Sequence, residues 1–204
     1  MKKTPEKILD TAHQLFNEEG VAAVSLRQIA AGMKISHGNL IYHFKSKQEI
    51  IERLHGRILQ AALEENQKLK DRQMSIWTLI QMARSGFKTL YDYRFFMIDL
   101  NLIMRENEKL KKEFLEIEKL RAHMYREAIS DAIEEGIMRE KEYAGEYEQF
   151  IKRIRIFSDC WISSAEIYNS EGVEQIIEEH VQLFMNMFYP YLTEKGKSAY
   201  KENL

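Results

Sequence analysis

Hydrogen-bonding side chains are concentrated between Ser36 and Phe44 of this 204-residue chain. Leu40 and Phe44 stand four positions apart, so on a helix they share one face. The side chains that lie largely off that face can donate or accept hydrogen bonds: His37, Asn39, Tyr42 and His43. A short helix with apolar anchors on one side and only hydrogen-bonding groups on the other suits the major groove of DNA, where base edges present donors and acceptors.

Two capping boxes bracket this segment and predict the helices that must position it. Ser25 with Gln28, and Ser46 with Glu49, have the spacing in which the hydroxyl caps a backbone N–H three residues on and the longer side chain reaches back. Between the boxes, a first short helix has one apolar face at i, i+3, i+4 and i+7, made by Leu26, Ile29, Ala30 and Met33. Ser36 is the expected N-cap of the second helix.

Other chemistries have little support in the sequence. A di-metal helical bundle needs a Glu-x-x-His from each of two helices, and the chain has one, Glu52 to His55, so we expect no metal and a surface histidine. Cys160 lies beside Asp159 and Trp161, on a helix expected to pack at a subunit boundary rather than to act as a nucleophile. There is no Gly-rich phosphate loop and no His-Glu-x-x-His. We therefore expect no enzyme and no cofactor.

Composition predicts an all-α protein. Only two prolines and nine glycines interrupt a chain that is 45% hydrophobic and rich in helix-forming residues. A single cysteine excludes an intramolecular disulfide, and neither a secretory signal nor an apolar run near 18 residues is present. We expect a cytoplasmic protein without a membrane anchor. Residues 1–50 hold seven Lys/Arg against five Asp/Glu, a small positive excess that does not contradict nucleic-acid binding.

The spaced residues of this segment resemble the helix-turn-helix of the TetR family of bacterial transcriptional repressors. The matching positions are Ile29-Ala30, Ile35-Ser36, Gly38, Leu40, Tyr42-His43-Phe44 and Lys47. Two positions depart from the family, which usually has glycine at Lys34 and tyrosine at Ile41. If Lys34 takes a positive φ, the left-handed conformation costs about 1–2 kcal/mol. Ile41 removes one expected phosphate contact and leaves that role to Tyr42 and His43.

The resemblance implies an N-terminal three-helix DNA-binding domain at residues 1–47 and a helical effector-binding and dimerisation domain at residues 48–204. It implies base-edge contacts from His37, Gly38 and Asn39, of which Asn39 is the best reader because an amide pairs bidentately with adenine. It implies phosphate contacts from the remaining polar residues, Ser25, Arg27, Tyr42, His43 and Lys47. The implied partner is a palindromic, double-stranded operator.

The C-terminal helices carry more apolar surface than a small subunit easily covers. A helix over residues 146–169 and another over 173–189 present an aromatic and aliphatic seam, from which we predict a homodimer interface made by Phe150, Ile154, Phe157, Trp161, Ile177, Phe184 and Phe188. Residues 107–135 are expected to form a helix with Leu120 and Met124 toward the core. The tail after Pro190 is expected to fray.

An apolar or amphipathic effector is implied by the resemblance, and its pocket residues are predicted from polar groups within apolar segments. Residues 95–104 form one apolar run with Asp99 and Asn101 as a buried polar pair that could orient a ligand. With these we group the aromatic residues Trp77, Tyr91 and Phe95. The overall prediction is a ligand-responsive repressor. The alternatives are an activator, or an effector-sensing adaptor dimer whose helix-turn-helix no longer binds DNA.

Overall fold

A computed structural model describes residues 4–69, 76–168 and 172–202 of the chain. Within these ranges the chain is helical, and its only β feature is an isolated bridge between Met138 and Leu192. The predicted all-α class is therefore confirmed. The chain divides into two compact units: unit 1 is residues 1–64 with 89–111, and unit 2 is residues 65–88 with 112–204. The functional division proposed at residue 47 stays a prediction.

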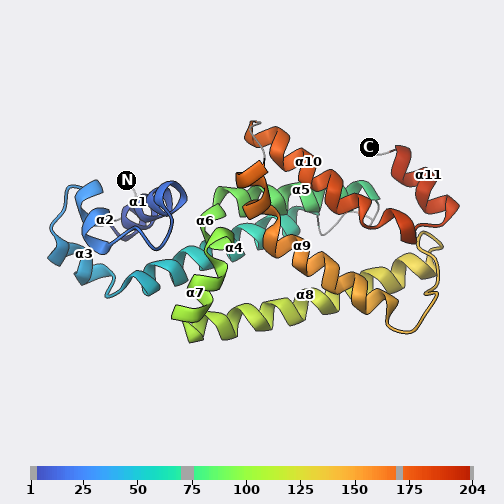
Figure 1. Cartoon of the computed structure of the whole chain (residues 1–204), viewed down its shortest axis with the longest axis horizontal. Helices are drawn as coiled ribbons and strands as arrows, with labels where there is room; N and C mark the ends of the chain where they lie inside the picture. The colour runs from blue at the N-terminus through green and yellow to red at the C-terminus, as the bar shows by residue number, and fades with distance from the viewer. Residues whose placement is uncertain (1–3, 70–75, 169–171, 203–204) are drawn as a thin grey trace. The chain divides into compact units, whose positions relative to one another are not determined.

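Unit 1 begins with four helices, α1 (Thr4–Glu19), α2 (Leu26–Gly32), α3 (His37–His43) and the first part of α4 (Lys47–Leu69) (Figure 1). Helix α1 has Pro5 in its first turn, where the missing N–H is not needed, and buries one stripe of residues: Ile8, Leu9, Ala12 and Phe16. It ends at Gly20, whose φ of 81° is the left-handed conformation expected after a helix. The sequence predicts that the helix starting at Lys47 runs to about Arg72, and the part after Leu69 lies outside the described residues.

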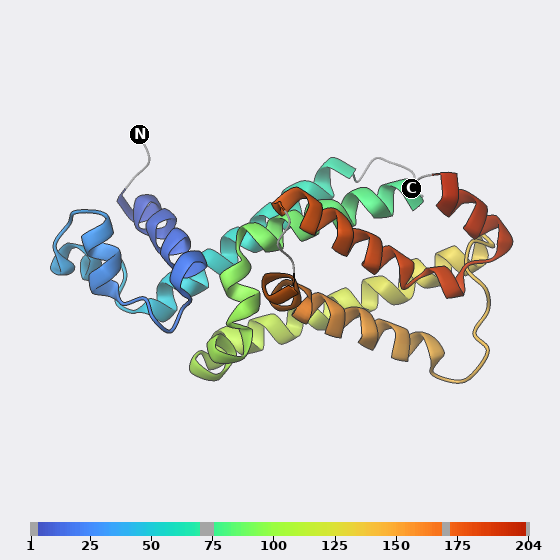
Figure 2. The ribbon, with the colours of Figure 1, turned by 45° about the horizontal axis from the view of Figure 1, so that its top comes forward.

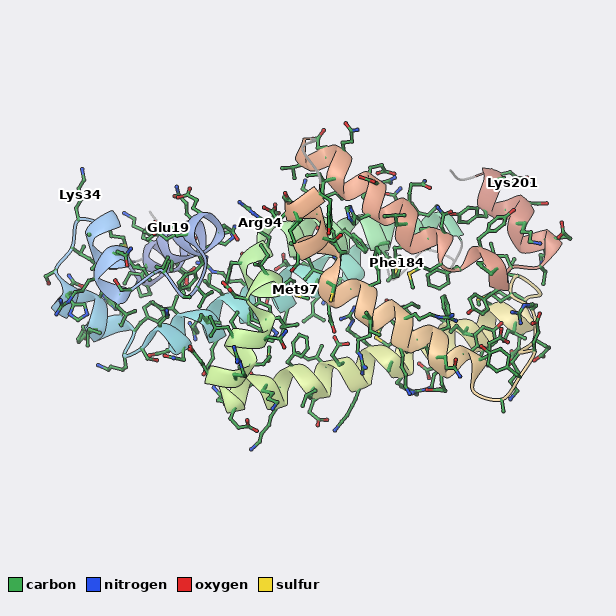
Figure 3. The ribbon with its side chains drawn as sticks, viewed as in Figure 1. Glu19, Lys34, Arg94, Met97, Phe184 and Lys201 are labelled. Carbon is green, nitrogen blue, oxygen red and sulfur yellow. The ribbon has the colours of Figure 1, made fainter. Side chains whose placement is uncertain are left out.

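The turn between α2 and α3 contains a left-handed lysine. Lys34 has a φ of 55°, and it is the one non-glycine residue with positive φ in the described part of the chain. Its N–H donates to the carbonyl of Ala31, and the N–H of Ile35 donates to that of Ala30, both at 3.0 Å, which closes the end of α2. In Figure 3 the Lys34 side chain points away from the helices. The strain anticipated from the family's usual glycine is thus present.

The rest of unit 1 comes from residues 89–111: the end of α5 (Ile76–Asp92), α6 (Arg94–Ile98), α7 (Leu100–Glu106) and the start of α8 (Glu108–Glu134). The single apolar run expected over 95–104 is divided at Asp99, whose ψ of 15° separates α6 from α7. The interruption of the helix at Asp99 also changes which side chains of this segment are buried. Phe95, Phe96 and Met97 are buried, Asp99 is half-buried and Asn101 is exposed, so the expectation of a buried polar pair was wrong.

Unit 2 is built on α8, α9 (Glu146–Tyr168) and α10 (Val173–Asn186), with the beginning of α5. Figures 1 and 2 show α9 beside both α8 and α10. Its core is aromatic: the Phe87 ring stacks on Trp161 at 4.7 Å and lies 5.5 Å from Phe184, which points inward from α10 (Figure 3). Leu120 and Met124 are 59% and 50% exposed, so their expected burial was wrong.

The C-terminal segment is ordered, which corrects the expectation of a frayed tail. A short 3-10 helix, η1 (Tyr189–Tyr191), follows α10, and α11 (Glu194–Glu202) follows η1. Tyr200 is 3% exposed, and its hydroxyl donates to Asn186 Oδ1 at 2.7 Å. Gly196 packs so closely on the backbone that a Cβ there would lie 2.2 Å from the carbonyl oxygen of Ile137. An aromatic anchor and a close backbone contact therefore dock a segment that looks polar in sequence.

A buried ion pair fixes the start of α9. The Arg139 guanidinium donates to both carboxylate oxygens of Glu146, at 2.6 and 3.1 Å, and the backbone N–H of Glu142 adds a third bond at 2.7 Å. The Glu146 side chain is 5% exposed. These hydrogen bonds, with the Arg139 bonds the strongest, hold the pKa of the Glu146 carboxyl at about 2. Charge-assisted, bidentate contacts of this kind are geometrically specific.

We predict that Lys34→Gly stabilises the protein. Glycine removes the left-handed strain of about 1–2 kcal/mol but adds entropy to the unfolded chain, so the free energy of unfolding should rise by about 0.5–1 kcal/mol. Urea denaturation followed by circular dichroism measures the change. Lys34→Ala is the control, because it removes the charge and keeps the strain. Equal stabilities of the glycine and alanine variants would show that the backbone is not strained there.

We predict that Glu146→Gln lowers stability most at neutral pH. Because the pKa of Glu146 is lowered in the folded state, its contribution is complete above its ordinary value of 4.5 and is lost as pH falls toward about 2. The difference in urea midpoint between wild type and variant should therefore shrink between pH 7 and pH 3. Glu148→Gln, which breaks the half-exposed pair with Arg126, should show a smaller effect at every pH.

Candidate nucleic-acid interface

Helix α3 is held by a cap at one end and by two buried side chains along its length. The Ser36 hydroxyl accepts a hydrogen bond from the backbone N–H of Asn39 at 3.1 Å, as the sequence predicts for an N-cap. Leu40 is fully buried and Phe44 is 4% exposed. These anchors leave α3 little freedom to rotate about its axis, so the direction of its other side chains is fixed.

The opposite face of α3 is polar and open. His37, Gly38 and Asn39 are exposed at its N-terminal end. Tyr42 is 77% exposed, and its ring meets that of His43 edge-on at 5.1 Å, while His43 is half-buried. The structure therefore brings the predicted base-reading residues together on one exposed surface. Their contacts with DNA stay predictions.

Helix α2 supports α3 and carries two of the predicted phosphate ligands. Its capping box is complete: Ser25 Oγ accepts from the Gln28 N–H at 3.3 Å, and Gln28 Oε1 accepts from the Ser25 N–H at 2.8 Å. Arg27 is exposed. At the second predicted box, Ser46 Oγ caps the Glu49 N–H at 3.1 Å. The Glu49 carboxylate, however, accepts from the backbone N–H of Lys45 rather than from that of Ser46.

Lys47 has a structural task that the sequence did not reveal. Its ammonium donates to the carbonyl oxygens of Val21 and Val24, at 2.6 and 3.1 Å, and so ties the loop before α2 to the start of α4. A phosphate contact from Lys47 would have to share an ammonium that is already bonded twice. Sequence reasoning missed this role because the partners are backbone atoms more than 20 positions away.

Residues 89–111 hold α1 through polar contacts. Asn17 donates from Nδ2 to the Asp92 carbonyl at 2.8 Å and accepts at Oδ1 from the Phe95 N–H at 3.1 Å. His13 stacks on Tyr93 at 4.3 Å and donates from Nε2 to the same Asp92 carbonyl. Asn17 was not singled out from sequence, and the signal that could have found it is an amide placed directly after the buried Phe16 of α1.

Two further contacts close unit 1. Asp99 Oδ2 accepts from the Val21 N–H at 2.7 Å, directly after α1. Glu52 of α4 accepts from Asn107 Nδ2 and Lys109 Nζ, both at 2.8 Å, and these bonds lower the pKa of its carboxyl. Both carboxylates are thus committed to fastening helices within unit 1.

The predicted effector residues do not form one described pocket. Tyr91 and Phe95 are buried, Asp99 is bonded to Val21 and Asn101 is exposed. The side chain of Trp77 lies outside the described residues. A ligand role for these five residues stays a prediction, and Asp99 has a structural partner that explains its place in an apolar segment.

The predicted dimer seam is largely buried within unit 2 of a single chain. Phe150, Ile154, Trp161, Ile177 and Phe184 are each at most 8% exposed, while Phe157 and Phe188 are half-buried. The Phe150 ring, for example, lies 4.4 Å from that of Tyr191 and meets Phe188 edge-on at 5.0 Å. The seam therefore does not need a second chain to cover it, which was the reason for assigning it to an interface.

Side chains considered for other chemistry lie apart. His55, expected at the surface, is 5% exposed and stacks on Phe96 at 5.0 Å, so that expectation was wrong. In the described ranges, no three His, Cys, Asp or Glu side chains gather in a way that could hold a metal ion. Cys160 is exposed. No described helix combines the length and the apolarity needed to span a bilayer.

Comparisons with known proteins agree with this arrangement. Residues 8–54 match the family model described as bacterial regulatory proteins of the tetR family, and residues 58–200 match the TetR model described as a bacterial transcriptional repressor. An HTH-type transcriptional regulator of Staphylococcus aureus (strain USA300) is 32% identical over 82 residues. That match spans 40% of this chain and 44% of the relative.

Solved structures share the fold over nearly the whole chain. A TetR-family transcriptional regulator from Marinobacter aquaeolei VT8 superposes with a TM-score of 0.86 at 21% identity, over 98% of this chain and 97% of that one. The ketosteroid transcriptional regulator KstR2 of Mycobacterium tuberculosis gives 0.73 at 19%, over 95% and 97%. The fatty acid degradation regulator FadR from Bacillus halodurans gives 0.67 at 17%, over 91% and 96%. Since the two family models together cover both the helix-turn-helix and the helices that follow it, the chain belongs to the TetR family of DNA-binding bacterial transcriptional regulators.

Proposed function

We propose that this protein is a ligand-responsive repressor that binds a palindromic operator as a homodimer, in the cytoplasm. The observation that carries the proposal is the exposed end of α3, where His37, Gly38 and Asn39 stand on a helix anchored by Leu40 and Phe44. A helix fixed in this way presents the same donors and acceptors to every DNA molecule it meets. Gly38 has no side chain, so it lets the helix backbone approach the base edges.

Phosphate contacts come from residues beside the reading face. Arg27 and Tyr42 are exposed and Ser25 lies at the N-terminus of α2, where backbone N–H groups favour an anion. His43 lies beside Tyr42 and is half-buried. These contacts set affinity and register, while Asn39 sets sequence preference. Lys47 acts mainly by holding the loop before α2 in place.

A second stripe on α9 supports the homodimer better than the buried seam does. Ile156, Cys160, Ser163 and Ile167 follow each other at i, i+4, i+7 and i+11, so they share one helix face. Ile156 and Ile167 are 59% and 72% exposed, and Leu183 of α10 is 46% exposed. Pairing two such faces removes this apolar area from water. Two copies of α3 could then meet successive major grooves, roughly 34–36 Å apart.

The effector in this proposal is an apolar or amphipathic molecule. Regulators of the same fold are named for ketosteroids and for fatty acid degradation, which is compatible with an apolar or amphipathic effector here. To release DNA tenfold, the effector must bind the non-binding conformation about 1.4 kcal/mol more tightly than the other. Asp99 is a sensitive point, because its bond to Val21 links residues 89–111 to the end of α1.

The rival function is an effector-sensing adaptor dimer that no longer binds DNA. Ile41 and Lys34 depart from the family pattern, but Ile41 lies on a well-formed α3 and Lys34 still completes the turn. Both observations favour DNA binding over the adaptor. Selection of DNA fragments from a random library by the wild-type chain separates the two functions, because the adaptor should enrich no sequence.

We predict that Asn39→Ala relaxes sequence preference and that Tyr42→Phe weakens binding to all sequences alike. Losing a bidentate base contact should reduce discrimination at one base pair by about 1–3 kcal/mol per half-site, whereas a lost phosphate contact carries no sequence information. Library selection and fluorescence anisotropy on the selected operator measure both effects. Gln14→Ala, an exposed change on α1, is the control. An unchanged sequence logo for Asn39→Ala would mean that Asn39 does not read a base.

We predict that the double variant Ile156→Asp/Ile167→Asp is monomeric, because charges on the α9 stripe oppose its burial. Light scattering at micromolar concentration should give twice the chain mass for wild type and the single-chain mass for the variant. Leu120→Asp, at a site on α8 that is also 59% exposed, should remain a dimer. Cys160 should react faster with a maleimide in the double variant than in wild type. A single-chain mass for wild type would refute the homodimer.

A further inference from the structure

A groove of about 420 Å³ lies between α8 and α9 in unit 2, and the two helices cross at an angle (Figure 2). None of its lining residues belongs to α3 or to the residues predicted to bind an effector. Its volume is within the range of small-molecule sites, which is about 300–1,000 Å³. Its lining is mixed, with basic, acidic and apolar side chains.

The charges that line the groove do not balance. Each of its three acidic side chains is already paired with a basic neighbour in the lining, in the ion pairs Glu116 with Lys119, Glu118 with Arg121, and Glu148 with Arg126. Three more cations remain: Lys112, Lys152 and Arg155. None of these three forms a salt bridge or a hydrogen bond to another side chain in the described part of the chain. The groove thus carries an excess of three positive charges in a chain whose net charge is −2.

The groove has both cations and apolar side chains in its lining, as an amphipathic ligand requires. Lys152 and Arg155 are three positions apart on α9, so their side chains leave the helix on neighbouring sides of one turn. The apolar contribution comes from Leu115 and Ala122 of α8 and from Ile151 of α9. Leu115 is 48% exposed, which is hydrocarbon that a ligand tail could cover.

A half-buried carboxylate, that of Asp159, lies beside the groove. Asp159 lies one turn after Arg155, and both Arg155 and Arg121 act on it electrostatically. Burial, together with repulsion from Glu118, raises the pKa of the Asp159 carboxyl, while the two arginines oppose the rise. Its Oδ1 is buried and accepts no hydrogen bond within the described residues. An anionic head group near Asp159 would be repelled, so it should sit at the Lys152 end of the groove.

We propose that this groove binds an amphipathic anion, with Lys152 and Arg155 holding a carboxylate or phosphate head group and the exposed Leu115, with Ala122, covering a hydrocarbon tail. Guanidinium groups suit both head groups, because their fork of N–H donors matches two oxygens at once. A positively charged or uncharged molecule of the same length lacks the electrostatic attraction to Lys152 and Arg155. An effect of this binding on operator affinity rests on the proposed function. Binding of the anion and affinity for the operator are therefore measured separately.

Titration calorimetry on the full-length wild-type chain, without DNA, tests the site with four eight-carbon probes. Octanoate and octyl phosphate should bind, and the tighter of the two identifies the head group, while octylamine and octanol should bind at least tenfold more weakly. Higher salt should weaken the anions, because their attraction is screened. Octylamine binding as tightly as the anions, or no heat from either anion, would overturn the proposal.

Charge reversal locates the site on the chain. Arg155→Glu should weaken anion binding at least tenfold, and Arg155→Lys should retain most of it. Lys201→Glu, an exposed reversal on α11, is the matched control and should bind as wild type does. Circular dichroism of each variant identifies a fold that has been lost. Unchanged binding by a folded Arg155→Glu variant would place the ligand elsewhere. If the wild-type chain binds octanoate but binds no operator, the proposed function is refuted and this site is not.

Discussion

The conformation of the loop between α1 and α2 is the constraint on which the DNA-reading surface depends. Its backbone is satisfied by two charged side chains from other parts of unit 1: Lys47 donates to the carbonyls of Val21 and Val24, and Asp99 accepts from the Val21 N–H. Hydrogen bonds to charged groups contribute about 1.5–3 kcal/mol each, more than neutral ones. Helix α2 begins directly after this loop, and α3 packs on α2. The conformation of the loop therefore sets the direction in which the Asn39 side chain points.

The same contacts explain why residues 89–111 belong to the unit that contains the helix-turn-helix. Asn17 binds the backbone on both sides of the break between α5 and α6, and Glu52 binds Asn107 and Lys109 where α7 gives way to α8. Side chains of α1 and α4 thus fasten this segment at both ends. A displacement of α6 or α7 must either carry α1 with it or break these bonds, so the segment is suited to transmit an effector's signal.

Local features of the fold were predictable, and distant partnerships were not. The capping box at Ser25 and the buried pair Leu40 and Phe44 follow from spacings of three or four residues, and the left-handed conformation of Lys34 was anticipated from the glycine usual at that position in the family. His55 and Tyr200 are buried against residues that sequence spacing does not point to, so the polar residues around them along the chain led to the wrong expectation of exposure. Among the predicted DNA-binding residues, local rules located the exposed face of α3 but missed the backbone partners of Lys47, which lie in another loop.

Helix α9 shows why an apolar seam seen in the sequence need not be covered by a second chain. It has apolar residues on two sides: Phe150, Ile154 and Trp161 are buried, whereas Ile156 and Ile167 are exposed. The hydrophobic effect does not depend on which molecule covers an apolar surface. A periodic apolar pattern therefore indicates that a helix face is covered, but not whether the same chain or a second copy covers it. The larger, aromatic face is used inside the chain, since an uncovered core would prevent the subunit from folding before it meets a partner.

What remains for a partner is the smaller aliphatic stripe, and Lys152 and Arg155 stand beside it on the same helix. In the proposed dimer, α9 of each copy packs against the other copy. A ligand that draws these cations toward α8 therefore acts on the helix through which the two copies would meet, and the DNA groove fixes the spacing of their reading helices at roughly 34–36 Å.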